Sequence, residues 1–284
     1  MNKGRLQHHT PAYENAVGQF GLPYHLEMIR DAERTGRICA ALHETLKPHY
    51  IHCELGAGTG IFSIYAARRC KKVYAVEKDP AILEFARENI ERAGLKNKIE
   101  LIHEDALNFR PPQKADNLLV EMMSIWCINE PQVPVMNHAL KHILKKDGQR
   151  TPMSITNLIE LGHYDFGALE VECKASITQF TGITAPRIMT ASHVFNKYDF
   201  SMQNPEEITQ SIEIPILLSG TLNCARLSSL VQLSPGITFY STDSLMPQTI
   251  VPLQNERKVK AGERIRLHAS FKLRSNVDEM KLMV

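Results

Sequence analysis

Apolar and polar residues follow two different periods along this chain, and the change falls near residue 150. Before that point, short apolar runs alternate with longer segments in which apolar residues recur at helical spacing. The short runs predict strands at residues 51–55, 72–76, 99–103 and 117–120. The longer segments predict helices at residues 24–46, 61–69, 79–94 and 133–144, with Thr35-Gly36 as a break inside the first. This alternation is typical of a doubly wound parallel sheet, whose ligands lie beyond the carboxyl ends of the strands.

After Thr151-Pro152 the helical period fades and a period of two replaces it. Apolar and polar residues alternate strictly from Arg264 to Leu273, which predicts a half-exposed antiparallel strand. Further strands are expected at residues 154–161, 211–218, 230–233, 237–240 and 249–253. Pro215 and Pro252 predict sheet edges or bulges. The expected fold class is therefore α/β, with a Rossmann-like domain followed by a mostly antiparallel β-barrel or sandwich.

These periods divide the chain into three expected parts. Residues 1–36 form a helical entry segment, residues 37–150 a Rossmann-like domain, and residues 151–284 the β-barrel domain. A chain of 284 residues with 43% hydrophobic residues is long enough for both domains to bury a core.

Charge and cysteine usage narrow the class of protein. The net charge is +2 and no block of Lys and Arg occurs, so a nucleic-acid partner is not indicated. The six cysteines are scattered and form no C-x-x-C pair, which is typical of reduced thiols in a cytosolic protein. No apolar stretch approaches a membrane span, and the polar residues 1–10 do not resemble a signal peptide.

The most specific motif follows the first predicted strand, where the pattern E-x-G-x-G-x-G ends at Gly60. Glycines directly after a buried strand let the backbone approach a ligand closely, and an acidic residue at the tip of the next strand, Glu77, can accept hydrogen bonds from two ribose hydroxyls. A dinucleotide fingerprint would place its third glycine where Ile61 stands. The pattern, which comprises Glu54, Gly56, Gly58 and Gly60, resembles instead the first motif of the class I S-adenosylmethionine (SAM) methyltransferases. A tight strand-to-helix turn without a ligand is the alternative.

Two further pairs of residues point less specifically to a ligand site. Asp105-Ala106 follows the third predicted strand, where class I methyltransferases contact adenine, but an aspartate that caps a helix fits this position equally well. His138 and His142 lie one helical turn apart, yet no third metal ligand is apparent, so we expect no metal site.

Two glutamates, Glu121 and Glu130, follow the fourth predicted strand and are joined by a loop that contains Ser124. Neighbouring carboxylates repel each other and need a cation between them, and a planar guanidinium fits such a pair through bidentate hydrogen bonds. The carboxylates would draw the positive charge toward the nitrogens that they bind and leave electron density on the nitrogen that faces a methyl donor. The pair therefore predicts a guanidine acceptor; surface carboxylates on a loop are the alternative.

With these motifs the chain resembles a divergent member of the protein arginine N-methyltransferase family, which joins a SAM-binding domain to a β barrel. The matching segments are residues 25–35, 54–63, 71–77, 121–130, 247–250 and 259–265. The resemblance implies that the entry segment covers the cofactor and that Arg34 pairs with its methionine carboxylate. SAM is then the cofactor, held by Arg34, Glu54, Gly56, Gly58, Gly60, Glu77, Asp105 and Ala106, and the catalytic residues are Glu121 and Glu130.

The chain also departs from this family. Ser244-Leu245-Met246 stands where the family has a Thr-His-Trp loop, and Met122 and Ile125 replace aromatic residues. The region after Ile155 is shorter, so the dimerisation arm is expected to be reduced and any homodimer to be weak or to use another surface.

Three functions follow from these observations. The leading one is methyl transfer from SAM to a guanidine nitrogen of a protein, a peptide or a small molecule. A second is methyl transfer to another acceptor such as nucleic acid, although base amino-methylases usually show an Asn/Asp-Pro-Pro-aromatic motif where residues 120–123 read Val-Glu-Met-Met. The third is a non-catalytic, regulatory SAM-binding protein.

Overall fold

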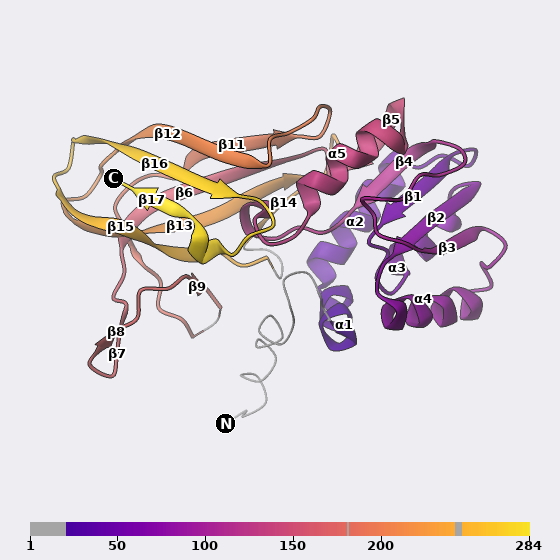
Figure 1. The fold of residues 1–284 in the computed structure, drawn as a ribbon, viewed down its shortest axis with the longest axis horizontal. Helices are drawn as coiled ribbons and strands as arrows, with labels where there is room; N and C mark the ends of the chain where they lie inside the picture. The colour runs from indigo at the N-terminus through magenta and orange to yellow at the C-terminus, as the bar shows by residue number, and fades with distance from the viewer. Residues whose placement is uncertain (1–20, 181, 242–245) are drawn as a thin grey trace.

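The computed structural model describes residues 21–180, 182–241 and 246–284. A parallel sheet with flanking helices forms one end of the molecule, and antiparallel sheets form the other (Figure 1). The polar residues 1–10, in which we expect no signal peptide, lie outside the described residues, as do Ser244 and Leu245.

The parallel sheet has the strand order β3-β2-β1-β4-β5. Its strands are β1 (Ile51–Leu55), β2 (Lys72–Glu77), β3 (Ile99–His103), β4 (Ala115–Val120) and β5 (Leu144–Thr151). Every residue of β1 is buried, as expected for a central strand that helices cover on both faces. The order reverses between β1 and β4, which is where open α/β sheets bind their ligands. The structure thus confirms the doubly wound sheet and its four predicted strands.

Strand β5 was not predicted, because its sequence is mostly polar, half of its residues are exposed, and it contains the turn signal Asp147-Gly148. It is an edge strand that pairs with β4, and the pairing contains a bulge. Ala115 pairs with Leu144, but Asn117, two residues later, pairs with Gln149. A bulged edge strand shows neither an apolar run nor a clean alternation.

The helices are α1 (Leu22–Arg30), α2 (Ala32–Thr45), α3 (Ile61–Ala67), α4 (Pro80–Arg92) and α5 (Gln132–His142). The predicted break at Thr35-Gly36 is wrong, since both residues lie inside α2 and the break falls at Asp31. The Asp31 carboxylate caps α2 by accepting the backbone N–H of Arg34 at 3.1 Å. The hydroxyl of Thr35 donates back to the carbonyl of Ile29 at 3.3 Å, which ties the start of α2 to the end of α1. Side-chain capping therefore outweighs the turn tendency of the Thr-Gly pair.

The antiparallel domain contains a seven-stranded, a three-stranded and a two-stranded sheet. Its longer strands are β6 (Ser154–His163), β11 (His193–Asp199), β12 (Glu207–Pro215), β13 (Gly220–Gln232), β15 (Thr249–Val259) and β16 (Arg264–Lys272). The shorter ones are β7 (Gly167–Ala168), β8 (Val171–Glu172), β9 (Ile177–Thr178), β10 (Arg187–Ile188), β14 (Thr238–Tyr240) and β17 (Lys281–Met283). As predicted, Pro215 lies in an edge strand, β12, and Pro252 pairs with Cys224 beside a register shift.

One buried cluster runs through both domains. It joins Leu55 and Leu118 of the parallel sheet to Leu227 and Leu267 of the antiparallel sheets. Helix α2 is also hydrogen-bonded to the antiparallel domain, through Arg37 Nη1 to the carbonyl of Thr238 at 2.8 Å. The antiparallel domain therefore helps to position the residues at the carboxyl end of the parallel sheet.

Between β6 and β9 the chain leaves the antiparallel domain as a projecting segment that carries β7 and β8 (Figure 1). Within the described ranges, no helix has the length and apolar character needed to span a membrane.

Candidate active site

A pocket of about 450 Å³ lies at the carboxyl ends of the parallel strands. Five residues of the predicted site line it: Gly56, Glu77, Asp105, Ala106 and Glu130. Its size lies within the range of small-molecule sites, and its walls come from several loops, as the switch-point rule predicts.

Glu77 connects the end of β2 to the glycine loop. Its buried carboxylate accepts the backbone N–H of Gly58 at 2.9 Å and that of Asp79 at 2.9 Å. A carboxylate offers about four acceptor positions. About two of these stay available for ligand hydroxyls in the pocket, so the geometry fits a ribose.

The three glycines all have left-handed backbones, but the space around them differs. A Cβ atom at Gly56 would lie 2.5 Å from Cε of Met122, and one at Gly58 would lie 3.2 Å from Nδ1 of His25. Met122 and His25 thus cover the loop closely. Gly60 is the N-cap of α3, and a Cβ atom there would make only an ordinary contact with Ala86 of α4, at 3.4 Å. Its φ of 78° therefore explains the glycine.

Glu54 lies beside the glycine loop and does not line the pocket. Its buried carboxylate accepts a short hydrogen bond from the hydroxyl of Ser63. Burial raises the pKa of Glu54 to about 8, while the Ser63 hydroxyl opposes the shift. The structure therefore gives Glu54 a contact within the protein, between the end of β1 and the start of α3.

Asp105 both caps a turn and lines the pocket, which are the two roles expected for its position. Its Oδ1 atom accepts the backbone N–H of Leu107 at 2.8 Å, which caps the turn after β3. The residue also lines the pocket, together with Ala106 and Leu107. One carboxylate oxygen is thus used in the turn, and the other is available at the pocket wall.

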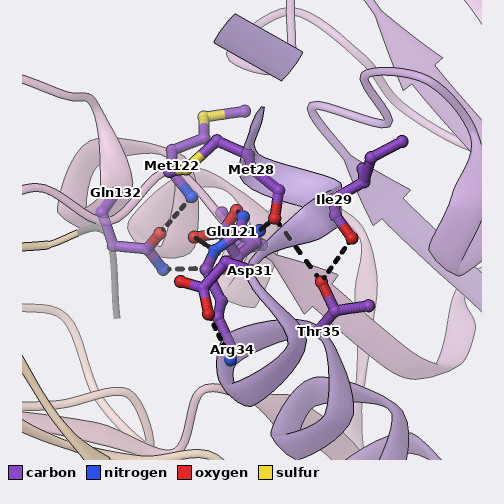
Figure 2. A network of polar contacts seen from close by, with 9 residues as sticks. Met28, Ile29, Asp31, Arg34, Thr35, Glu121, Met122 and Gln132 are labelled. Carbon is purple, nitrogen blue, oxygen red and sulfur yellow. Dashed lines mark hydrogen bonds and ion pairs between the residues drawn. The ribbon is translucent and has the colours of Figure 1, made fainter. Parts of the chain in front are cut away.

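Arg34 and Glu121 bind each other (Figure 2). Arg34 Nε donates to one carboxylate oxygen of Glu121 at 3.3 Å, and Nη2 makes a short ion pair with the other. Nη1 donates to the carbonyl of Met28 at 3.1 Å. The residue predicted to hold the cofactor is therefore paired with a residue predicted to hold the acceptor.

Gln132 fixes the backbone around Glu121 (Figure 2). Its side chain donates to the carbonyl of Val120 at 3.0 Å and accepts the N–H of Met122 at 2.8 Å. The sequence gives no signal for this role, because Gln132 reaches Glu121 only after the chain has turned back into α5.

Glu130 lines the pocket, and its carboxylate has no hydrogen bond with the described residues. Burial raises its pKa to about 7, while the positive charges of Arg34 and Lys78 oppose the shift. The pKa of Arg34 is lowered mainly by burial, and the charges of Tyr24, Asp31 and Glu130 counteract this. The guanidinium of Arg34 thus interacts with both glutamates, through hydrogen bonds with Glu121 and through charge with Glu130.

Trp126 anchors the loop between the two glutamates in the antiparallel domain. Trp126 and Cys127 have left-handed backbones, with φ of 55° and 58°. The buried indole donates to the carbonyls of Ser228 at 3.0 Å and Leu158 at 3.2 Å, and it stacks on Phe195 at 4.7 Å. Such strain persists only where the surroundings hold it, so the antiparallel domain sets the loop conformation.

Three comparisons place this geometry among known proteins. Residues 53–148 match the methyltransferase domain family. An uncharacterized protein of Methanocaldococcus jannaschii is 28% identical over 91% of this chain and 95% of its own. The arginine N(omega)-methyltransferase of Streptomyces achromogenes is 22% identical over 89% of this chain and 78% of its own.

A solved structure, the Trypanosoma brucei PRMT1 enzyme-prozyme complex with AdoHcy, has the same fold. It superposes with a TM-score of 0.76 over 90% of this chain and 89% of that chain, at 16% identity. The glycine loop, the ribose-compatible Glu77 and the matched methyltransferase domain agree on SAM as the cofactor. Residues 53–148 therefore form a class I SAM-dependent methyltransferase domain, and the chain resembles the protein arginine N-methyltransferases.

Proposed function

We propose that this enzyme transfers the methyl group of SAM to a guanidine nitrogen. The observation that carries this proposal is the guanidinium of Arg34, which binds Glu121 in a bidentate manner and interacts with the charge of Glu130. Glu121 thus binds a guanidinium, and the charge of Glu130 acts on the same group, which supports a guanidine acceptor at this pair. The name of the Streptomyces relative, an arginine N(omega)-methyltransferase, supports the same acceptor class.

The cofactor is proposed to lie across the glycine loop. Glu77 accepts from the ribose hydroxyls, Asp105 and Ala106 face the adenine, and Gly56 and Gly58 let the amino-acid tail approach the backbone. Glu54 and Gly60 hold the shape of this loop. Arg34 exchanges part of its contact with Glu121 for the carboxylate of the cofactor, and this exchange makes Glu121 available to the acceptor.

Glu130 is proposed to receive the proton that the guanidine nitrogen loses when the N–C bond forms. A proton acceptor is most effective when its pKa lies near the working pH. The pKa of Glu130, raised to about 7 by burial, meets this condition. Glu121 and Glu130 together orient the nitrogen and bias the charge of the guanidinium away from it.

Labelled SAM incubated with L-arginine, with L-argininamide and with an arginine-containing peptide tests the acceptor class. Mass spectrometry should place the label on a guanidine nitrogen of at least one of them. Two results would contradict the proposal. One is label found only on a nucleobase; the other is no label on these three compounds or on any protein of a cell extract.

We also propose a weak homodimer and a cytosolic location. The projecting segment exposes Leu169 and Val171, which are 98% and 59% exposed, and a second copy of the chain would bury them. Sedimentation at micromolar concentration should show self-association that Leu169→Asp abolishes, and a monomer under all conditions would refute it.

The six cysteines form no disulfide, which supports a reducing compartment.

A further inference from the structure

Arg274 brings a positive charge from the antiparallel domain to the pocket. It follows β16 and lines the pocket together with Asn129 and Glu130. Its backbone N–H donates to the carbonyl of Ile128 at 2.6 Å, and the Asn129 side chain donates to the carbonyl of Ser275 at 3.4 Å. Two bonds thus fasten this turn to the loop that carries Glu130.

The backbone of Arg274 is unusual for a residue with a side chain. Its φ is 62°, in the left-handed region that glycine adopts without strain. If only the turn mattered, glycine would serve better at this position. Strained residues cluster at functional sites, so the presence of arginine indicates a role for the side chain.

The guanidinium of Arg274 is exposed and makes no hydrogen bond or ion pair with any residue that the structure describes. Lys78, the other strong cation of the pocket wall, differs because its charge acts on the carboxylate of Glu130. Arg274 is therefore a cation at the pocket with no anion of its own.

A free cation beside a site for a guanidinium disfavours the acceptor unless the acceptor also carries an anion. We propose that the acceptor is a small guanidino acid whose free carboxylate binds Arg274 while its guanidinium binds Glu130. Free arginine is the simplest member of this class. An arginine inside a protein has its carboxyl group in a peptide bond and offers no such anion, so this inference, which rests on the proposed function, separates small molecules from proteins as substrates.

Arg274 acts here as a specificity-determining residue that holds the end of the acceptor away from the reacting nitrogen. Arginine binds carboxylates through two parallel hydrogen bonds. A contact of this kind is made equally in the ground state and the transition state, so its loss raises KM and leaves kcat unchanged.

Steady-state methylation of L-arginine, L-argininamide and a peptide with an internal arginine tests the proposal. The wild-type kcat/KM should be about tenfold higher for L-arginine than for the amide or the peptide. Arg274→Gln should raise the KM for L-arginine about tenfold and leave the amide unaffected. Arg274→Gly suits the left-handed backbone and should show the same rise in KM for L-arginine in a well-folded protein. Arg274→Lys keeps a positive charge and should retain part of the preference for L-arginine over the amide. Arg266→Gln, which removes an arginine that pairs with Glu213, is the matched control and should change nothing.

The outcomes separate this inference from the function on which it rests. Equal methylation of acid, amide and peptide, or an equal loss on all three in Arg274→Gln, would overturn the inference and leave guanidine methylation intact. If none of the three is methylated, and calorimetry shows that none binds the protein loaded with S-adenosylhomocysteine, both fail.

Discussion

Arg34 and Glu121 lie 87 positions apart and form a buried bidentate ion pair between α2 and the end of β4. The side chains are only 8% and 15% exposed. The pair connects the N-terminal helices to the loop that carries the two glutamates, and it shows that this loop accommodates a guanidinium.

We expect the two partners of this pair to be strongly coupled. Removing one partner of a buried pair leaves an uncompensated charge, so Arg34→Ala should lower the free energy of unfolding by about 3–5 kcal/mol. Glu121→Ala should have a similar effect, and the double variant should cost much less than the sum. Urea unfolding of the four proteins measures this coupling, and additive effects would show that the pair contributes nothing.

Glu77 should carry much of the affinity for the cofactor. Glu77→Ala removes the acceptor of two ribose hydroxyls and should weaken SAM binding by about 2–4 kcal/mol. Calorimetry measures this loss. Glu84→Ala on the exposed face of α4, where Glu84 pairs with Arg87, is the control and should bind SAM as the wild type does. An unchanged affinity in Glu77→Ala would remove Glu77 from the cofactor site.

Methylation should require ionised Glu130. Because burial raises the pKa of this carboxyl to about 7, kcat/KM should fall as the pH drops through about 7 and level off above it. The pH profile measured at low acceptor concentration reports the free enzyme. A flat profile between pH 6 and 8, or the same midpoint in Glu130→Gln, would assign the titration to another group.

His52 should make the stability of the fold depend on pH. The ring is fully buried, its Nδ1 lies 2.7 Å from Oδ1 of Asn117, and its Nε2 has no partner among the described residues. Burial lowers the pKa of His52 to about 4, below its ordinary value of 6.5. The unfolded chain therefore binds the proton more readily, and stability is full above about pH 6.5.

Between about pH 6.5 and 4 the protein should lose up to about 3 kcal/mol through this residue alone. Carboxylates also titrate in this range, so the informative quantity is the difference between wild type and His52→Gln in urea unfolding at pH 7 and pH 4.5. Equal losses in the two proteins would mean that His52 is not the source.

The sequence contains enough information to predict the parallel sheet and part of the pocket. Glu77 and Asp105 come directly after apolar strands, and the ends of parallel strands converge whatever the loops do. The break at Asp31 was missed because it depends on a side-chain cap that periodicity does not show. Gln132 and Arg274 reach the site only through tertiary packing, and no local pattern marks them.

The roles of Glu121 and Glu130 are the central claim, and turnover of Glu130→Gln with a guanidine acceptor tests it most directly. The substitution keeps size and hydrogen bonding but removes a charge that the acceptor and the leaving proton both need. Losing such a charge should cost about 2–5 kcal/mol, so turnover should fall by roughly thirtyfold to several thousandfold. SAM affinity, measured on the same protein, should be nearly unchanged. Full methylation in Glu130→Gln, or a loss of SAM affinity that accounts for the defect, would contradict guanidine transfer at this pair.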